Sequence, residues 1–231
     1  MLFAGTSGFS FKEWVGPFYP PKTPAKKYLA YYASLMNSVE INHTFRRFPR
    51  PEHMEKWAAE TPESFKFSIK MHQSVTHMAR LRNVSAAVAE FIAALDPLGP
   101  RLGVVLFQLP PNFRANVDLL RDFLKALPSG RKCALEFRHE SWREPAVRDL
   151  LREAGVALCG ADVEIGETVP ETTARHAYLR LRKEPPYTEA ELEGARRQVA
   201  GVLAEADDLY LYVKHDAAGL APAAVERLKA P

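Results

Sequence analysis

A hydrophobic run that ends in ionisable side chains is the first candidate for chemistry. The stretch CALEFRHESW begins with apolar residues and then presents Glu136, Arg138 and His139, with Trp142 three residues further on. Side chains two positions apart on a strand share a face, so Glu136 and Arg138 can point into the same space. A carboxylate or an imidazole can transfer protons, and an arginine fork matches phosphate or carboxylate oxygens. The pattern therefore suggests acid–base chemistry beside a bound anion.

Other apolar runs along the chain also end in polar residues. Glu40 and Asn42 repeat the spacing of Glu136 and Arg138. We predict as catalytic residues Glu136, Glu40, Asp162 and His139. We predict as substrate-binding residues Thr6, Ser7, Asn42, Lys70, Gln108, Arg138, Trp142, Arg180 and Lys214. The cations among them favour an anionic ligand.

Eight short runs rich in Val, Ile, Leu, Phe and Tyr must position these residues. They begin at Leu2, Ser38, Phe65, Gly103, Cys133, Val156, His176 and Leu209. Most are apolar on both faces, as is typical of parallel strands buried between a core and a layer of helices. Helical signals lie between them, with predicted starts at Thr23–Pro24, at Asn83, at Asn116 and at Thr188, the last with Glu191 as a capping box.

This alternation predicts an α/β fold, a (β/α)8 TIM-type barrel that forms a single domain over residues 1–231. Active sites of such barrels lie at the C-terminal ends of the strands, which is where the polar residues follow the apolar runs. A doubly wound sheet is the alternative. It needs open edge strands, and none of the eight runs is polar or contains proline.

The polar strand ends have two interpretations. They can form a network of ion pairs that closes the barrel, or they can line a pocket for a small molecule. Polar groups end at least seven of the eight runs, whereas the opposite ends, such as Leu2, Val104 and Val156, are mostly apolar. A charged pocket explains the whole set better than closure does.

Metal binding and nucleic-acid binding remain alternatives. His43, His139 and His215 follow strand ends, but the chain has no HExxH or CxxC motif, so we predict no metal ligands. His72 and His77 are interpreted as loop histidines. A loop rich in Arg and Phe, at residues 45–50, suits stacking on bases and contact with phosphates.

Composition limits the remaining classes of function. The net charge of +3 is too small to indicate a polyanion partner by itself. Cys133 and Cys159 lie in apolar runs, so we expect buried free thiols and a cytoplasmic protein. The chain shows no signal peptide and no apolar run long enough to span a membrane. The aromatic residues after the first strand, in GTSGFSFKEWVGPFYP, can form a lid over the mouth or plug one end of the barrel.

Several motifs, read in order, resemble the YecE-like family, catalogued as domain of unknown function 72. They are GTSGFSFKEWVGPFYP, SVEINHTFRRFP, LGVVLFQLPPNF, LEFRHESW, GVALCGAD and YLYVKHDAAGLAP. The resemblance implies a (β/α)8 barrel and offers no established reaction. The matching positions that it marks as functional are Thr6, Ser7, Glu40, Asn42, Thr44, Gln108, Glu136, Arg138, His139, Trp142 and Asp162. The ends of the seventh and eighth runs depart from the family pattern.

The sequence thus predicts an enzyme, of hydrolase or lyase type, that acts on a phosphorylated or otherwise anionic small substrate. The alternatives are a nucleic-acid-binding protein and a metal-dependent, nuclease-like phosphodiesterase. The sequence identifies neither a cofactor nor an oligomeric state.

Overall fold

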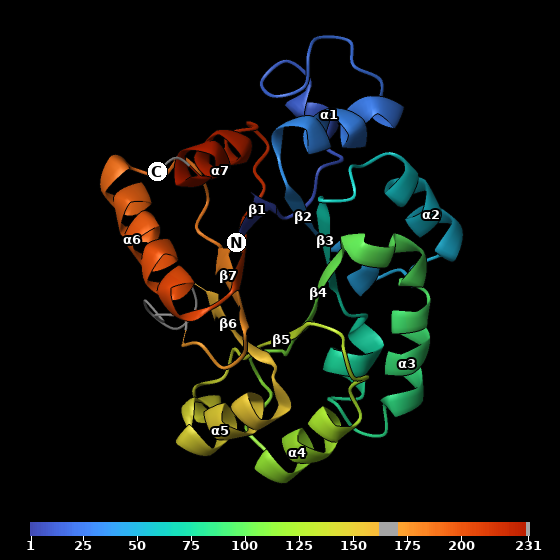
Figure 1. Ribbon diagram of the computed structural model, residues 1–231, viewed down its shortest axis with the longest axis vertical. Helices are drawn as coiled ribbons and strands as arrows, with labels where there is room; N and C mark the ends of the chain where they lie inside the picture. The colour runs from blue at the N-terminus through green and yellow to red at the C-terminus, as the bar shows by residue number, and fades with distance from the viewer. Residues whose placement is uncertain (162–170, 230–231) are drawn as a thin grey trace.

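Eight parallel strands form one nearly closed barrel, which confirms the predicted fold. The computed structural model describes residues 1–161 and 171–229. The strands are β1 (Leu2–Thr6), β2 (Ser38–Ile41), β3 (Lys66–Lys70), β4 (Leu102–Gln108), β5 (Cys133–Glu136), β6 (Ala157–Ala161), β7 (His176–Leu181) and β8 (Asp208–Val213). Their order is β1-β8-β7-β6-β5-β4-β3-β2, so neighbours along the chain are neighbours in space (Figure 1).

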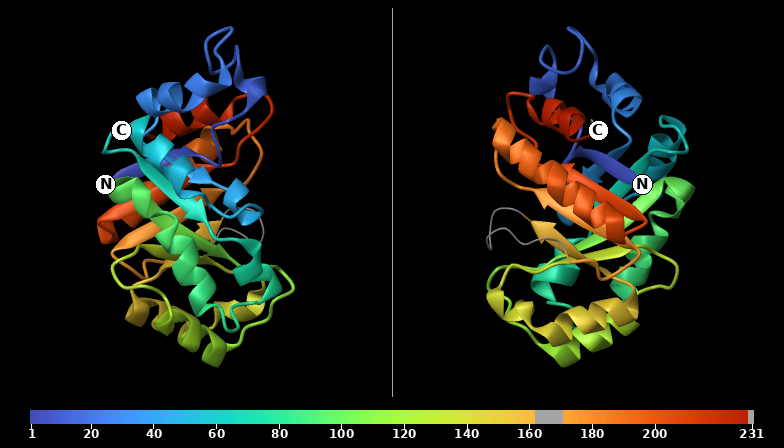
Figure 2. Two further views of the ribbon diagram at one scale, coloured as in Figure 1. Left: turned by 90° about the vertical axis from the view of Figure 1, so that its right-hand side faces the viewer. Right: turned by 60° about the vertical axis from the view of Figure 1, so that its left-hand side comes forward.

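Helices surround the barrel on its outer side (Figures 1 and 2). They are α1 (Tyr28–Leu35), α2 (Pro51–Ala59), α3 (Ser85–Ala93), α4 (Val117–Lys125), α5 (Pro145–Ala154), α6 (Glu189–Glu205) and α7 (Ala221–Lys229). Asn116 caps α4 through Leu119 N, and Thr188 with Glu191 forms a capping box at α6, as predicted. Within the described residues, none of the helices has the length and apolar character needed to cross a membrane.

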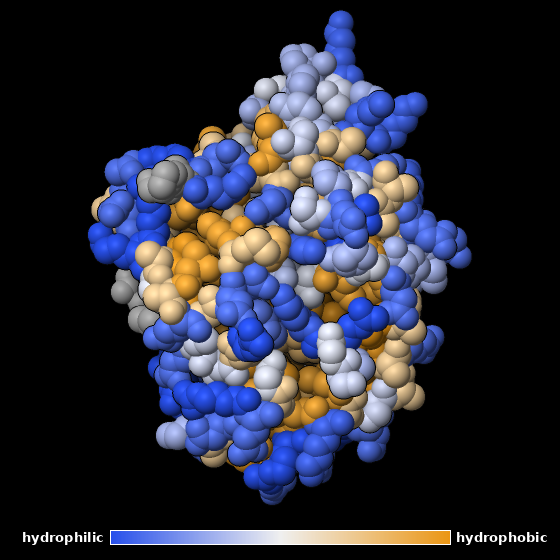
Figure 3. Space-filling view, in the orientation of Figure 1, coloured by the Kyte–Doolittle hydropathy of each residue, from blue (hydrophilic) through white to orange (hydrophobic). Residues whose placement is uncertain are grey.

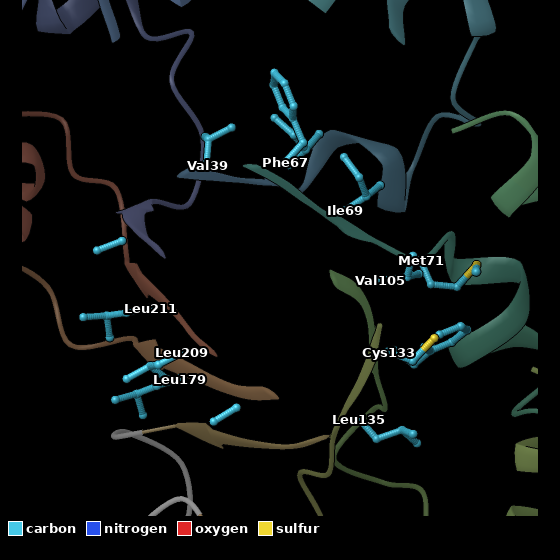
Figure 4. Close-up of a cluster of buried hydrophobic side chains, with 14 of the residues drawn as sticks. Val39, Phe67, Ile69, Met71, Val105, Cys133, Leu135, Leu179, Leu209 and Leu211 are labelled. Carbon is cyan, nitrogen blue, oxygen red and sulfur yellow. The ribbon is translucent and has the colours of Figure 1, made fainter. Parts of the chain in front are cut away.

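Alternation along the strands separates two hydrophobic clusters. The outer cluster lies between strands and helices, and Figure 4 shows its side chains pointing away from the barrel axis. The inner cluster is smaller and includes Phe3, Leu106, Tyr178, Tyr210 and Tyr212. Because successive side chains of a strand face opposite ways, the inward positions continue upward to the polar residues at the carboxyl ends. This alternation brings Glu40, Glu136 and Arg180 into the barrel rather than against a helix.

The seam between β1 and β2 is closed by side chains. Among the described residues no strand ladder joins these two strands, although β1 pairs with β8 and β2 pairs with β3. Asn37 donates to Leu2 O and accepts from Ala4 N, both at 2.8 Å. The hydroxyl of Tyr32 accepts from Thr6 N at 2.8 Å and lies 3.2 Å from Ser38 O, to which it can donate. These bonds satisfy backbone groups that a ladder would otherwise pair.

The Tyr32 hydroxyl should therefore contribute measurably to stability. In Tyr32→Phe, Thr6 N loses its partner in a fully buried place, which we expect to lower the free energy of unfolding by about 1–3 kcal/mol. Urea unfolding measures the change. Tyr31→Phe is the matched control, because the partly exposed Tyr31 makes ring contacts in the same region. Equal losses in the two variants would contradict a special role for the seam.

The amino-terminal end of the barrel is also charged, contrary to the expectation of a mostly apolar end. Lys132 Nζ lies 2.6 Å from Asp208 Oδ2 and 5.4 Å from the centre of the Tyr210 ring. Lys66 Nζ donates to Pro100 O at 2.6 Å. Figures 1 and 3 look onto this end, and Figure 3 shows hydrophilic and hydrophobic side chains intermingled there. Charge at a strand end is therefore no sign of function by itself.

A cavity of about 480 Å³ lies beside this end of the barrel, at the C-terminal ends of α4 and α5. Its charged lining residues include Arg131 and Lys132, each of which has an acidic partner: Asp96 at 2.6 Å and Asp208 at 2.6 Å. Because both cations already have acidic partners, we do not expect this cavity to bind an anion. Lys70, which has no such partner among the described residues, lies at the opposite end of the barrel.

Candidate functional site

Three buried ionic side chains meet at the carboxyl-terminal mouth of the barrel. Arg180, at the end of β7, donates from Nη2 to Glu40 Oε1 at 2.8 Å and from Nη1 to Glu136 Oε2 at 2.5 Å. Arg180 is 1% exposed, Glu40 is 0% exposed and Glu136 is 3% exposed. The guanidinium thus joins β2 to β5 across the barrel. We call Glu40, Arg180 and Glu136 the mouth triad.

Further donors complete the hydrogen bonds of the two carboxylates. Asn42 Nδ2 donates to Glu40 Oε1 at 2.7 Å, and the hydroxyl of Tyr178 donates to Glu40 Oε2 at 2.8 Å. Arg138 Nε donates to Glu136 Oε1 at 2.9 Å. Each carboxylate oxygen therefore has at least one donor. This level of satisfaction is what a charged group needs when it is removed from water.

The cations keep both carboxylates ionised. Burial alone would raise the pKa of Glu136, but the charges of Arg180 and Arg138 outweigh it and lower that pKa from 4.5 to about 2. Burial alone would also raise the pKa of Glu40, but the charge of Arg180 outweighs it, so this pKa is lowered as well. Neither group carries a proton near neutral pH. Both are therefore poor general acids, and their geometry suits them to hold Arg180 in place.

Glu136 makes the stability of the protein depend on pH. Its folded-state pKa of about 2 lies below the ordinary 4.5, so the unfolded chain takes up a proton first as the pH falls. Its stabilising contribution is present above the unfolded pKa and is lost as the pH falls toward the folded pKa. We expect a loss on the order of 3 kcal/mol over this range, which Glu136→Gln should abolish. Urea unfolding at a series of acidic pH values measures it, and parallel declines in both proteins would contradict the assignment.

Lys70 lies at the end of β3 beside the mouth triad. Its Nζ donates to Gln108 Oε1 at 2.6 Å and lies 4.2 Å from the centre of the Phe45 ring. Burial, and then the charge of Arg180, lowers the pKa of Lys70 from 10.5 to about 8. Within residues 1–161 and 171–229, Lys70 takes part in no ion pair. Lys132, at the opposite end of the barrel, does have an ion-pair partner, Asp208.

The loop after β3 brings in His77, which was interpreted as a loop histidine. The imidazole packs edge-on against Phe45, with 4.7 Å between ring centres. Burial, and then the charge of Lys70, lowers the pKa of His77. The loop contains a π-helix at Ser74–Met78, and Arg80, Leu81 and Asn83 all have positive φ. Such backbone features are frequent at functional sites, but they cannot be predicted from the spacing of residues in the sequence.

Two further residues of the mouth were not predicted. Tyr178 points inward from β7 and binds Glu40, although in sequence it reads as an ordinary apolar strand residue. Arg182 follows Arg180 by two positions, and its charge contributes to the low pKa of Glu40. The alternation that pairs Glu136 with Arg138 could have identified Arg182 as well.

Five predicted site residues make other contacts. Thr6 binds Tyr32 at the seam, Ser7 lies 3.1 Å from His215 Nδ1, and Lys214 pairs with Glu184 at 2.7 Å. His139 caps the turn at Ser141. Trp142 is 3% exposed and donates to Phe113 O at 2.6 Å.

The remaining described residues of the predicted set meet at the mouth. They are Glu40, Asn42, Lys70, Gln108, Glu136, Arg138 and Arg180. Asp162 lies outside the described residues.

The aromatic segment after β1 packs against α1 and the end of β8. Trp14 and Tyr19 are fully buried, and Tyr19 stacks on Tyr28 with 4.3 Å between ring centres. Trp14 Nε1 donates to Asp216 O at 2.8 Å. These anchors favour a fixed structural segment over a lid that opens.

Thr44, a position marked by the family resemblance, fixes the backbone at Lys70. Its hydroxyl donates to Lys70 O at 2.7 Å and is fully buried. The contact holds the end of β3 in place and so helps to aim the amine into the mouth.

The described parts of the chain contain no group of three or more His, Cys, Asp or Glu side chains suited to a metal ion.

Comparison with known proteins connects this geometry to a family. A family model described as "Protein of unknown function DUF72" matches residues 3–231. The chain is 27% identical over 221 residues to the UPF0759 protein YecE of Escherichia coli (strain K12), covering 94% of this chain and 75% of that protein. It is 34% identical over 154 residues to the UPF0759 protein YunF of Bacillus subtilis (strain 168), covering 63% and 53% respectively.

Solved structures agree with the fold. The crystal structure of a DUF72 family protein from Thermotoga maritima has a TM-score of 0.88 and 26% identity, covering 99% of this chain and 98% of that chain. A DUF72 family protein from Enterococcus faecalis has a TM-score of 0.81 at 18% identity, covering 99% and 96%. The second likeness shows the fold alone.

Proposed function

The chain belongs to the DUF72 family of proteins of unknown function, and from this premise we propose that it is an enzyme of hydrolase or lyase type. Its substrate is a small phosphorylated or otherwise anionic molecule, bound at the carboxyl-terminal mouth of the barrel. The observation that carries the proposal is Lys70. This cation is held among other cations, with no carboxylate as its ion-pair partner in the described residues.

The surroundings of Lys70 suit an incoming anion. Burial is the main cause of the lowered pKa of Lys70, and the charges of Arg180 and Arg138 also lower it, while those of Glu136 and Glu40 raise it. A bound phosphate or carboxylate would stabilise the charged amine and gain charge-assisted hydrogen bonds. Arg180 also has a buried Nε with no hydrogen-bond partner among the described residues. An unpaired buried donor is costly, so it adds to the demand for an acceptor.

The carboxylates act as positioning groups in this proposal. Glu40 and Glu136 stay ionised and fix Arg180, while the pKa of Lys70 is lowered to about 8. Efficient proton transfer requires a pKa near the working pH. We therefore assign proton transfer to Lys70 rather than to Glu40 and Glu136.

A thermal-shift screen with phosphorylated and carboxylated metabolites tests the proposal. We expect a saturating ligand to raise the melting temperature by on the order of 5–10 °C, since binding at a hundred times Kd stabilises by about 2.7 kcal/mol. Lys70→Met should abolish the shift. Lys66→Met is the matched control, because Lys66 lies on the same strand at the opposite end of the barrel. Absence of any shift, or equal loss in both variants, would contradict an anion site at the mouth.

Nucleic-acid binding is a second candidate, favoured by one surface. Arg46, Arg47 and Arg50 are exposed in the loop after β2, and Phe48 is 39% exposed beside them. Phe45 lies under Lys70 instead, so a single aromatic ring is left in this loop for stacking on bases. Binding of oligonucleotides should weaken steeply with salt if this surface is used. Binding that is absent at low salt removes this candidate.

We also propose a cytoplasmic location. Cys133 and Cys159 are buried free thiols, and burial raises the pKa of both. Such thiols are unreactive core groups of the kind found in reducing compartments.

A further inference from the structure

We propose that Lys70 is a nucleophilic amine that forms an imine with an aldehyde or ketone carrying a phosphate or carboxylate group. This inference rests on the proposed function, since it uses the same mouth, and it narrows the substrate to carbonyl compounds. It assigns the reaction to the lyase side, in which an imine withdraws electrons from a neighbouring carbon–carbon bond.

The position of the amine is defined by three contacts. Gln108 Oε1 accepts from Nζ at 2.6 Å, and Gln108 Nε2 donates to Leu109 O at 3.0 Å, which fixes the orientation of that amide. The face of Phe45 covers Nζ at 4.2 Å from its ring centre. Thr44 anchors the Lys70 carbonyl. The residue as a whole is partly exposed, and these contacts hold its amine in one place.

The burial of this amine increases the share of its neutral form. Burial is the main cause of the lowered pKa, and the charge of Arg180 is the next, while Glu136 and Glu40 act in the opposite direction. A lysine that is desolvated or placed beside other cations is an activated nucleophile.

The covalent step needs no further reactant. The lone pair of neutral Nζ attacks the carbonyl carbon, and the electron pair of the C=O bond moves to oxygen. The nitrogen gives up one proton and the oxygen takes up one, which yields a carbinolamine. The hydroxyl is then protonated and leaves as water while the nitrogen forms a double bond to carbon, and the resulting iminium releases its N–H proton to give the imine. Amine and carbonyl thus become imine and water, with no net change in protons or oxidation state. His77 contacts the same Phe45 ring and is the imidazole placed to relay these protons.

The alternative interpretation of Lys70 is a plain anion-binding cation. An arginine can replace a lysine in that role but cannot form an imine. The variant Lys70→Arg therefore separates the two interpretations, since it retains the positive charge.

Reductive trapping tests the inference. The full-length protein is incubated with glycolaldehyde phosphate, or with uncharged glycolaldehyde, in the presence of sodium cyanoborohydride, and adducts are located by peptide mass mapping. We expect Lys70 to be labelled at least about tenfold faster than Lys66 by the phosphorylated aldehyde, because the phosphate is held beside Lys70. The labelling rate should rise with pH around the Lys70 pKa of about 8. Lys70→Arg should lose the adduct.

The outcomes distinguish this inference from the proposed function. Ligand-induced thermal shifts without an adduct at Lys70 overturn the imine and leave the anion site standing. Equal labelling of Lys66 and Lys70, or equal labelling by the phosphorylated and uncharged aldehydes, also overturns it. Absence of both shifts and adducts overturns the inference and the proposed function together.

Discussion

Arg180→Met should lower the free energy of unfolding by about 3–5 kcal/mol at neutral pH. The substitution leaves Glu40 and Glu136 fully buried without their shared cation. The pKa of both carboxyls then rises relative to the unmodified protein, because the charge of Arg180 no longer opposes burial, although Arg138 still acts on Glu136. The deficit relative to the unmodified protein should therefore shrink as the pH falls and the carboxyls take up protons. Urea unfolding at several pH values measures both effects.

Arg175→Met is the control for this prediction. Arg175 lies just before β7 and pairs with Asp207 at 2.7 Å, but its side chain is 91% exposed. An exposed pair contributes little, so we expect a change within about 0.5 kcal/mol. The combination Arg180→Met with Glu136→Gln should recover part of the loss, since it removes one of the two buried carboxylates that lose Arg180. If the two single arginine variants behave alike, the mouth triad does not support the fold.

Gly5→Ala should be comparably damaging, with an expected loss of about 3 kcal/mol or more in the free energy of unfolding. A Cβ atom at Gly5 would lie 1.9 Å from Ser38 O and 2.8 Å from the Tyr32 hydroxyl. Both neighbours belong to the seam between β1 and β2, so backbone must move to admit a methyl group. Chemical denaturation and the yield of folded protein measure the effect.

Gly201→Ala is the matched control for the same chemical change. Gly201 lies inside α6, and nothing lies within 4 Å of its added Cβ. Alanine favours a helix over glycine, so this variant should gain about 0.5–1 kcal/mol. Opposite signs for the two variants are the expected result. A neutral Gly5→Ala would mean that the seam is loose.

The fold could be predicted because its signals are local and repeated. Eight apolar runs with helical signals between them leave few architectures open, and the alternation of side chains correctly paired Glu40 with Asn42 and Glu136 with Arg138. The ion pairs of Arg180 with Glu40 and Glu136 could not be predicted from this alternation. They depend on the width of the barrel and on how far the Arg180 side chain extends from a third strand.

Local competition explains the helix starts that were misplaced. The Thr23 hydroxyl donates to Pro20 O instead of capping a helix, and a 3-10 turn begins one residue later than predicted, at Ala25, and leads into α1 at Tyr28. Asn83 adopts a left-handed conformation at φ 53°, and Val84 precedes the first residue of α3. Short polar side chains favour turns as readily as caps, so sequence alone does not decide between them.

The amino-terminal end of the barrel shows why the structure is needed to decide which charged residues already have a partner. Lys132 and Asp208 were not recognised as partners because 76 positions separate them in sequence. Once they are paired, that end needs no ligand. Lys70 has no such partner in the described residues, and only the structure distinguishes the two cases.

The central claim is that the mouth holds an anion beside Lys70. The most direct measurement is an NMR titration of the Lys70 amine, by ¹³C-methylated lysine signals assigned with Lys70→Arg, with and without the phosphorylated compound that gives the largest thermal shift. We expect a midpoint near the pKa of about 8 in the free protein and a higher midpoint in the complex, because a bound anion favours the charged amine. A midpoint that the compound leaves unchanged would contradict the claim.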